Sequence, residues 1–358
     1  MGFVGEAIVS TNPPVPPFIK NKLSQCVSLV AKIYFPDKWP LFLRDFLALL
    51  STGNPTNAAE MFCRVLDAVD ETIVCGAFGG AFDNQCASRV KDAMRNDRDA
   101  LSQLTEAWRQ LIICSDAKVA IAATSTAMRY VDWMDVTLFT SAQSAQMSAQ
   151  TQSIADAARV SLTAEDADRR AAGCSFFAAL VAKGMDHFTK VELITGLRLV
   201  ETCAHLHQTA TAEQDDDANV CAAQLTAAVG HELLACLRAG DVAHGADQTE
   251  PHAASPPVVT LQQAATLTDT LMPTAVNHLR SEDERAVAAA LPLCSAYVLR
   301  LKDPSTSGKG TGTPKGQEQS RDTGGFGFGD GGGDRFWRVG GWRGTGRRRS
   351  CVCQPRDC

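Results

Sequence analysis

Residues 54–74 read "NPTNAAEMFCRVLDAVDETIV", and their apolar side chains recur with the spacing of an α-helix. Phe62, Leu66, Val69 and Ile73 follow one another at steps of four, three and four residues. This spacing places all four on one face of a helix with 3.6 residues per turn. We therefore expect an amphipathic helix that buries this face against other helices.

The same periodicity extends to both sides of this stretch. No run alternates apolar and polar residues with enrichment in β-branched side chains, so the pattern gives no indication of strands. We expect helices almost throughout residues 17–301. Further apolar faces are predicted in the first helix at Ile19, Leu23, Cys26, Val30 and Ile33, and near the end of the chain at Val287, Leu291, Cys294, Val298 and Leu301.

Turn signals divide this region into helices of about 12 to 20 residues with short connectors. Thr56 or Asn57 is expected to cap the helix after "STGNPTN", and Ser115 or Asp116 the helix after "CSDAK". Successive antiparallel helix pairs are typical of a HEAT-type solenoid with about 40–47 residues per repeat. We predict an all-α fold, a HEAT-repeat α-solenoid of antiparallel helix pairs. The alternative is a closed bundle, which suits four to six helices better than the ten to twelve expected.

Composition changes at both ends of the chain and within it. We expect residues 1–16 to be a disordered segment and 17–302 to be the solenoid. Loops or inserts are expected near 141–163, which is rich in Ala, Gln and Ser, and near 241–258. From Asp303 the chain holds 15 of its 27 glycines, and we predict a disordered Gly/Arg-rich tail over 303–358. It either binds RNA weakly through charge and stacking or is a low-complexity gene-model artefact.

The charge is distributed unevenly. From residue 305 onward ten Lys or Arg stand against five Asp or Glu, a net of +5, while the whole chain carries −6. Residues 1–304 therefore carry about −11. An acidic body disfavours broad, nonspecific binding to nucleic acid, which depends on neutralising phosphates. Any RNA contact must come from local basic patches.

No sequence motif indicates an enzyme, a cofactor site or a membrane protein. There is no P-loop, dinucleotide-binding glycine motif, HExxH or GxSxG, and no secretory signal or long uncharged apolar stretch, so neither catalysis nor membrane insertion is expected. Most of the 13 cysteines sit singly in apolar helical patterns and are expected to be free and buried. Cys351, Cys353 and Cys358 lack partners at zinc-site spacing, so no metal is expected.

Two other polar groups have ordinary explanations. His205 and His207 lie two residues apart near a predicted helix end and face different directions, so we expect them to be solvated. "DDD" at 215–217 is expected to be a charged helix start, because acidic residues favour the first turn.

Several ordered segments resemble one protein family. "PFIKNKLSQCVSLVAKIYFPDKWPLFLRDFLALL" (17–50), the stretch 54–74, "RVKDAMR" (89–95) leading to Trp108, "YVDWMDVTLF" (130–139) and "KGMDHFTKVELITGL" (183–197) are similar, in the same order, to segments of the exportin-T family. Weaker similarity continues through 278–302. The resemblance thus covers about residues 17–302. Compared with the family, the chain is expected to lack the N-terminal Ran-binding repeats and the C-terminal half.

The resemblance implies a tRNA exportin of the importin-β, or karyopherin, superfamily. Such a carrier binds tRNA together with Ran-GTP, passes the nuclear pore in contact with pore proteins, and shuttles between nucleus and cytoplasm without hydrolysing anything itself. We expect a monomer that recognises RNA shape and backbone, chiefly the acceptor and T arms. The alternatives are a HEAT-repeat karyopherin-like carrier or scaffold for protein cargo, and an RNA-associated protein that acts through its tail.

The candidate RNA contacts are basic residues of the helices that resemble the family. They are Lys20, Lys22, Lys38, Arg44, Arg89, Lys91 and Arg95. The alternative for each is an exposed, solvated side chain with no specific role.

Overall fold

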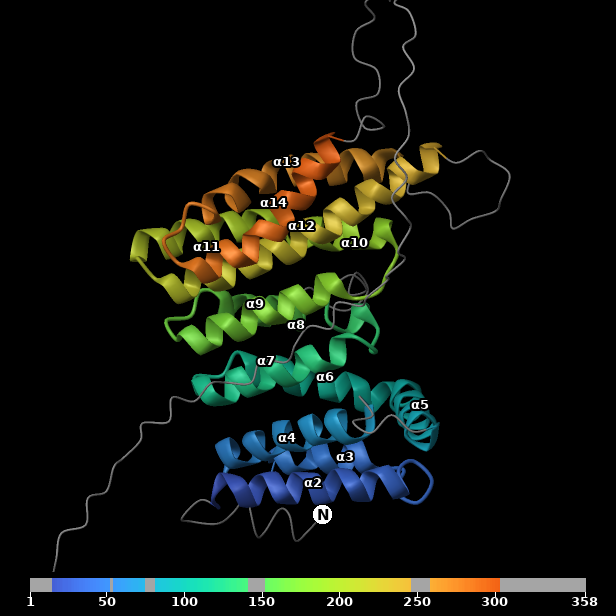
Figure 1. Ribbon diagram of the computed structural model, residues 1–358. Coiled ribbons are helices and arrows are strands. Elements are labelled where there is room, and N and C mark those ends of the chain that lie inside the picture. The colour runs from blue at the N-terminus through green and yellow to red at the C-terminus, as the bar shows by residue number, and fades with distance from the viewer. Residues whose placement is uncertain (1–14, 52–53, 75–80, 141–151, 246–257, 303–358) are drawn as a thin grey trace, which may run out of the picture. The chain divides into compact units, whose positions relative to one another are not determined.

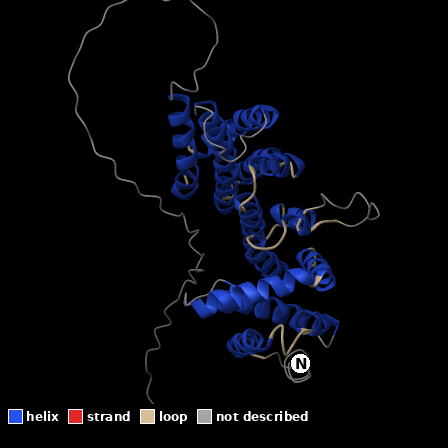
Figure 2. Ribbon diagram, turned by 90° about the vertical axis from the view of Figure 1, so that its right-hand side faces the viewer, coloured by secondary structure: helices blue, strands red, loops and turns tan. Residues whose placement is uncertain are grey.

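The computed structural model describes residues 15–51, 54–74, 81–140, 152–245 and 258–302. In these residues it contains 13 α-helices and no strand, which confirms the predicted all-α, HEAT-like helical repeat (Figure 2). The first helix begins at Pro17 and the last ends at Lys302. The predicted tail and most of the predicted N-terminal segment lie outside the described residues.

Six helices form a first row, in which each helix contacts the next (Figure 1). Because all contacts in the row are between neighbours, the row grows along the chain in the way that a helical repeat requires. Its members are α2 (Pro17–Tyr34), α4 (Pro55–Val69), α7 (Ala117–Val131), α9 (Ala167–Ala182), α12 (Asp216–Gly245) and α14 (Glu284–Lys302).

A second row consists of helices that pair with those of the first. The pairs α6–α7, α8–α9, α11–α12 and α13–α14 are hairpins whose helices pack against each other. The helices of the second row are α3 (Phe42–Leu47), α6 (Arg98–Ile112), α8 (Ile154–Leu162), α11 (Leu199–Glu213) and α13 (Val258–His278).

Additional helices lie between the hairpins and lengthen the repeats. The helices of the second row begin 45 to 59 residues apart, and all of these spacings except the one of 45 exceed the predicted 40–47. The extra length is in part helical, because α5 and α10 each follow a helix of the first row. These elements are α5 (Ala81–Asn96) and α10 (His187–Gly196), with the short turns η2 (Ala48–Ser51), η3 (Asp70–Val74, a π-helix) and η4 (Val136–Leu138).

Side-chain caps explain where the helices begin. The Asn54 side chain accepts hydrogen bonds from the backbone N–H groups of Thr56 and Asn57, so the predicted cap at Thr56 or Asn57 is wrong. Asn54 takes this role because Pro55 at the first helical position needs no N–H partner. Asp116 caps α7 as predicted. Further side-chain caps are Asp97, Ser153, Asp166 and Asp186.

Two predicted irregular segments turn out to contain regular helix. Within 141–163, residues Ile154–Leu162 form α8, a member of the second row with a capping box at Ser153. The alanines of α8 are buried, so this helix packs closely against its neighbours. The expected loop at 241–258 is likewise helical up to Gly245, where α12 ends, and residues 141–151 and 246–257 lie outside the described part.

The apolar face predicted in 54–74 is confirmed, and the face predicted in the first helix is not. Phe62, Leu66, Val69 and Ile73 are all at most 1% exposed. In α2, however, Ile19, Val30 and Ile33 are 42%, 43% and 69% exposed, and the side toward α4 contains Lys20, Ser24 and Ser28. In α14, Leu291, Val298 and Leu301 are also exposed. Both helices lie at an end of the described row and therefore have a neighbour on one side only.

Helix α12 is the central helix of the second half of the structure. Its stretch Asp216–Gly240 is long and apolar enough to cross a membrane by length and composition alone. Two-thirds of the residues in its most apolar window are buried against neighbouring helices, and α12 contacts α9, α11, α13 and α14. This burial explains its hydropathy as that of a core helix.

Candidate nucleic-acid interface

The seven basic candidates lie in the first part of the row. Lys20 and Lys22 are in the first turns of α2, Arg44 is in α3, and Lys38 is in the turn that follows α2. The other three, Arg89, Lys91 and Arg95, are in α5. Since an α-helix rises 1.5 Å per residue, Lys22 lies roughly 18 Å along α2 from the turn that contains Lys38. The candidates therefore divide between the two ends of α2.

Lys20 is a structural residue of the α2–α4 interface. It is 3% exposed, and its Nζ donates to Glu60 Oε2 at 2.5 Å and to Asn57 Oδ1 at 3.3 Å. Burial disfavours the charged form of Glu60, but hydrogen bonds from Lys20 and Arg64 outweigh this effect and lower the pKa of the Glu60 carboxyl. A buried cation paired in this way is part of the helix contact, would be costly to leave without its partner, and is poorly placed to reach RNA.

Arg44 and Arg89 also have partners within the protein. Arg44 Nη2 donates to Asp97 Oδ1 at 3.0 Å and thereby joins α3 to the N-cap of α6. This hydrogen bond lowers the pKa of Asp97. Arg89 donates to Asp37 Oδ2 at 3.1 Å and to the backbone carbonyl of Lys32 at 3.0 Å, so it holds α5 against the end of α2.

Arg95 connects α5 to the turn after α7. Its Nη2 donates to the Trp133 carbonyl at 2.7 Å, and its guanidinium lies 5.7 Å from the centre of the Trp133 ring. It also forms an ion pair with Asp92 at 3.3 Å. About half of its side chain (49%) remains exposed, so it combines a structural contact with an accessible charge.

Three of the seven candidates form no ion pair within the described residues. The ammonium of Lys22 donates to Gln25 in the same helix at 3.1 Å, and that of Lys38 lies 5.6 Å from the centre of the Tyr34 ring. Lys91 is half-buried. Lys38 lies next to Asp37, which binds Arg89. The turn after α2 therefore forms one group of candidates with helix α5, and this group is more basic than the group of Lys20 and Lys22.

Later repeats use basic side chains in the same structural way. Lys183, after α9, donates to the carbonyls of Val131 and Asp132 at 2.7 and 2.8 Å, at the end of α7. Arg169 of α9 donates to the Ile112 carbonyl of α6 at 2.9 Å. The last carbonyls of a helix lack partners within the helix and attract cations. Many basic residues of this acidic chain therefore connect one repeat to the previous one.

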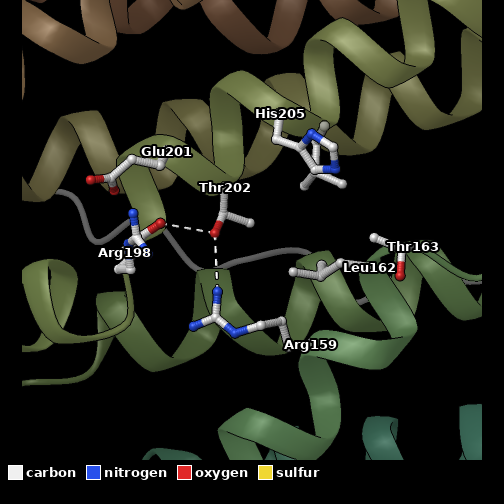
Figure 3. Close-up of a pocket in the computed structure, with 8 residues that line it drawn as sticks. Arg159, Leu162, Thr163, Arg198, Glu201, Thr202 and His205 are labelled. Atoms are coloured by element: carbon white, nitrogen blue, oxygen red, sulfur yellow. Dashed lines mark hydrogen bonds between the residues drawn. The ribbon is translucent and has the colours of Figure 1, made fainter.

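A pocket between α8 and α11 is a feature that the sequence did not predict (Figure 3). Its volume is about 280 Å³. Leu162 and Leu206 are buried and form its apolar floor. The remaining lining residues are Arg159, Thr163, Arg198, Glu201, Thr202 and His205.

The polar side of this pocket is organised around Thr202. Arg159 donates to the Thr202 hydroxyl at 3.2 Å and to the Leu197 carbonyl at 2.6 Å, while that hydroxyl donates to the Arg198 carbonyl at 2.8 Å. Arg198 has φ of 51° and ψ of 43°, the left-handed conformation that usually selects glycine. Arg159 is therefore already bound to oxygens of the protein at the edge of this pocket.

A polar cluster in the second half also departs from the sequence prediction. His207 Nδ1 lies 3.2 Å and His278 Nδ1 3.0 Å from Asn219 Oδ1, and the two rings are 4.4 Å apart. The prediction that His207 is solvated is therefore wrong, because its partners come from α12 and α13. His205 is exposed, as predicted. The acidic run at 215–217 does start α12, with Asp215 accepting from the Ala218 N–H at 2.9 Å.

Comparison with known proteins supports the resemblance seen in the sequence. The profile of the family described as "Exportin 1-like protein" matches residues 16–165. Exportin-T of Oryza sativa subsp. japonica is 33% identical over 135 residues, which are 36% of this chain and 13% of the rice protein. Exportin-T of Arabidopsis thaliana is 29% identical over 197 residues, which are 51% of this chain and 18% of that protein.

A fungal relative matches over a longer segment. Exportin-T of Yarrowia lipolytica is 28% identical over 247 residues, which are 64% of this chain and 22% of that protein. The chain thus matches less than a quarter of the length of each of these relatives. Seven curated relatives from plants, fungi, an amoeba and a fish have the same name. Together with the two rows of helices, these matches make the chain similar to exportin-T proteins over part of their length.

Proposed function

We propose that the protein is a nuclear export receptor for tRNA, which binds tRNA cooperatively with Ran-GTP and carries it through the nuclear pore. The observation that carries this proposal is the match to exportin-T proteins over as much as 64% of the chain. As a carrier, the protein itself catalyses no reaction. It shuttles between nucleus and cytoplasm and contacts pore proteins during passage.

The repeat architecture offers a physical basis for cooperative binding. Within the first row the main contacts join successive helices, so a change of curvature is distributed over many small interfaces. Two ligands that favour the same curvature share the free-energy cost of reaching it. Their binding is then coupled, and each raises the affinity for the other by the same factor.

Lys22, Lys38 and Lys91 are our preferred RNA contacts among the seven candidates. They form no ion pair in the described part of the chain, so their charge is available for phosphates. Arg44, Arg89 and Arg95 are already bound to protein groups and would position the surface while still adding positive charge. Lys20 is buried and supports α2 from inside.

Binding of labelled tRNA to the full-length protein, with and without Ran-GTP, tests the proposal. We expect tighter binding with Ran-GTP and a fall in affinity as salt rises. Replacing Lys22, Lys38 and Lys91 together by alanine should reduce the slope of log K against log salt by about 2. Lys118→Ala, an exposed lysine on α7, is the matched control. Equal affinity for tRNA with and without Ran-GTP would contradict the proposed function. An unchanged slope in the triple variant would contradict the assignment of Lys22, Lys38 and Lys91 as RNA contacts.

A carrier of protein cargo is the second candidate, and the acidic body favours it. The whole chain has a net charge of −6 and the tail from residue 305 has a net charge of +5, so residues 1–304 carry about −11. Such a surface attracts basic proteins more readily than RNA. Affinity purification that recovers basic proteins and no tRNA in the presence of Ran-GTP would support this candidate over the first.

A further inference from the structure

Two cysteines face each other where α9 packs against α12. An ion pair between Arg170, in the first turn of α9, and Asp215, just before α12, places the beginnings of both helices together. Both helices then run away from this pair side by side. Cys174 follows Arg170 by four residues and Cys221 follows Asp215 by six, which is about 6 Å and about 9 Å along the respective axes. The two thiols therefore meet across the interface between successive repeats.

The surroundings give the two thiols different roles. Cys174 is buried, whereas Cys221 is partly exposed. The hydrogen bond from the Cys174 thiol, together with the nearby Arg170 guanidinium, lowers the pKa of Cys221, and the same hydrogen bond and burial raise the pKa of Cys174. Arg170 is fixed in place because it donates to the carbonyls of Ala164 and Glu165 at 2.7 and 2.8 Å. Cys221 is thus an accessible thiol beside a fixed cation and a second thiol.

Three other cysteines, Cys63, Cys203 and Cys26, show how this environment differs from those of single buried or exposed thiols. Burial raises the pKa of both Cys63 and Cys203, the latter to about 12, and neither side chain reaches solvent. Cys26 is exposed on α2 but has no second cysteine beside it in the described structure. Reactive thiols require access, a stabilised thiolate and, for reversible oxidation, a neighbouring thiol.

We propose that Cys221 is a peroxide-sensitive modification site and that Cys174 resolves it, so that a reversible disulfide joins two successive repeats. The oxidant is a hydroperoxide. The Cys221 thiolate attacks its terminal oxygen, a sulfur–oxygen bond forms, and the oxygen–oxygen bond breaks. Sulfur loses two electrons, and the peroxide is reduced to an alkoxide or hydroxide that takes up a proton.

The second step consumes the sulfenic acid formed at Cys221. The Cys174 sulfur attacks the Cys221 sulfur, a disulfide bond forms, and the sulfur–oxygen bond breaks. The departing hydroxide takes the proton of the Cys174 thiol and leaves as water. The product links α9 to α12 and restricts their relative movement, so it stiffens one step of the helical row. This inference does not depend on which cargo the protein carries.

Peptide mapping of the full chain after treatment with hydrogen peroxide tests the proposal. We expect a peptide in which Cys174 is linked to Cys221, which is lost on addition of dithiothreitol. In Cys174→Ser the link is lost and dimedone, a probe for sulfenic acid, labels Cys221. In Cys221→Ser both products are lost. Cys203→Ser, which removes a buried thiol nearby, should retain the link.

A measurement on the unaltered protein keeps the proposal testable if a variant fails to fold. At neutral pH, iodoacetamide should alkylate Cys221 faster than the exposed Cys26, because more of Cys221 is thiolate. Thermal unfolding of the oxidised protein should occur at a higher temperature and return to the original value after reduction. Alkylation of Cys221 no faster than of Cys26, or a disulfide from Cys221 to any other cysteine, would overturn the proposal.

Discussion

The two halves of the described structure pack their cores in different ways. From α2 to α9 the core is built around aromatic side chains, and the largest fully buried side chains among the residues that the structure describes all lie before residue 178. Trp108 and Tyr130 are 5.2 Å apart between ring centres, and Phe46 stacks on Phe62 at 5.6 Å. Such large side chains fill the space between neighbouring helices.

From α11 to α14 the core consists of small and aliphatic residues. A Cβ atom added to Gly230 of α12 would lie 2.6 Å from Leu293 Cδ1, so α12 and α14 approach closely there. A buried polar cluster, around Asn219, also lies in this half. We call it the alanine-rich half because, among its described residues, the core contains buried alanines, as the first half also does, but no buried Phe, Tyr or Trp. These alanines include Ala210, Ala222, Ala223, Ala264, Ala275, Ala286 and Ala290.

This difference affects how readily each half can be recognised and how it responds to substitution. The exportin profile matches residues 16–165, which lie in the aromatic half. Large buried side chains leave a distinctive sequence pattern, whereas alanine-rich helices resemble many unrelated helices. We expect the aromatic half to be most sensitive to loss of volume and the alanine-rich half to gain of volume.

The largest effect is expected from Trp108→Ala. Trp108 is fully buried in α6, and removing a buried aromatic side chain costs about 3–5 kcal/mol. The free energy of unfolding from urea denaturation, followed by circular dichroism, measures the loss. Phe188→Ala is the control, because Phe188 is 46% exposed and should change stability little. Similar losses of unfolding free energy in Trp108→Ala and Phe188→Ala would contradict the conclusion that the core of this half depends on aromatic side chains.

Gly230→Ala should test the alanine-rich half in the opposite direction. The added methyl group collides with buried Leu293, and overpacking of this kind costs about 1–3 kcal/mol. The double variant with Leu293→Val should recover part of the loss. Gly196→Ala in α10 is the matched control, since nothing lies within 4 Å of the position of its new Cβ.

His278 should make the alanine-rich half sensitive to acid. Burial, with a smaller contribution from His207, lowers the pKa of His278 to about 4. The unfolded chain therefore binds the proton first, and the stability of the folded state falls as pH drops from about 6.5 toward 4, by an amount on the order of 1 kcal/mol. Hydrogen exchange of α12 and α13 across this pH range measures the loss of stability. His278→Gln should flatten the dependence, and His205→Gln, at an exposed position, should not.

Asp67 should give the aromatic half a smaller dependence of opposite sign. Burial raises the pKa of Asp67 to about 6, although Arg129 opposes this shift from 3.3 Å. The folded chain binds the proton first, so stability falls as pH rises from about 3.8 to 6. A third of the side chain is exposed, and we expect less than about 1 kcal/mol. Asp67→Asn should remove this pH dependence of stability, measured by hydrogen exchange of α4 and α7. If the pH dependence were unchanged in the variant, another titratable group would be its cause.

Helical periodicity predicted the class of fold but not every packed face. In residues 54–74 the apolar face is the buried one, because α4 has neighbours on several sides. In α2 the pattern was equally clear, yet Lys20, Ser24 and Ser28 face α4 and Ile33 is exposed. Periodicity shows that a helix is amphipathic, and it contains no information on which side the next helix packs.

The candidate site was less predictable because the partners of basic residues are distant in sequence. Arg44 binds Asp97, 53 residues away, and Arg89 binds Asp37, 52 residues away. Nothing near Arg44 or Arg89 in the sequence distinguishes them from Lys38 or Lys91. The pocket at Arg159 and the contact between His207 and His278 also depend on the packing of separate helices. Only the fold reveals which charges are already neutralised.

The neighbour-only contacts of the first row also bear on how the chain acquires its fold during synthesis. Each new helix finds its docking surface in a hairpin that has already left the ribosome, as α7 does on α4 and α9 on α7. No contact of the row requires the last residue of the chain, so assembly can proceed along the chain while it is being synthesised. Folding of this protein should therefore keep pace with translation.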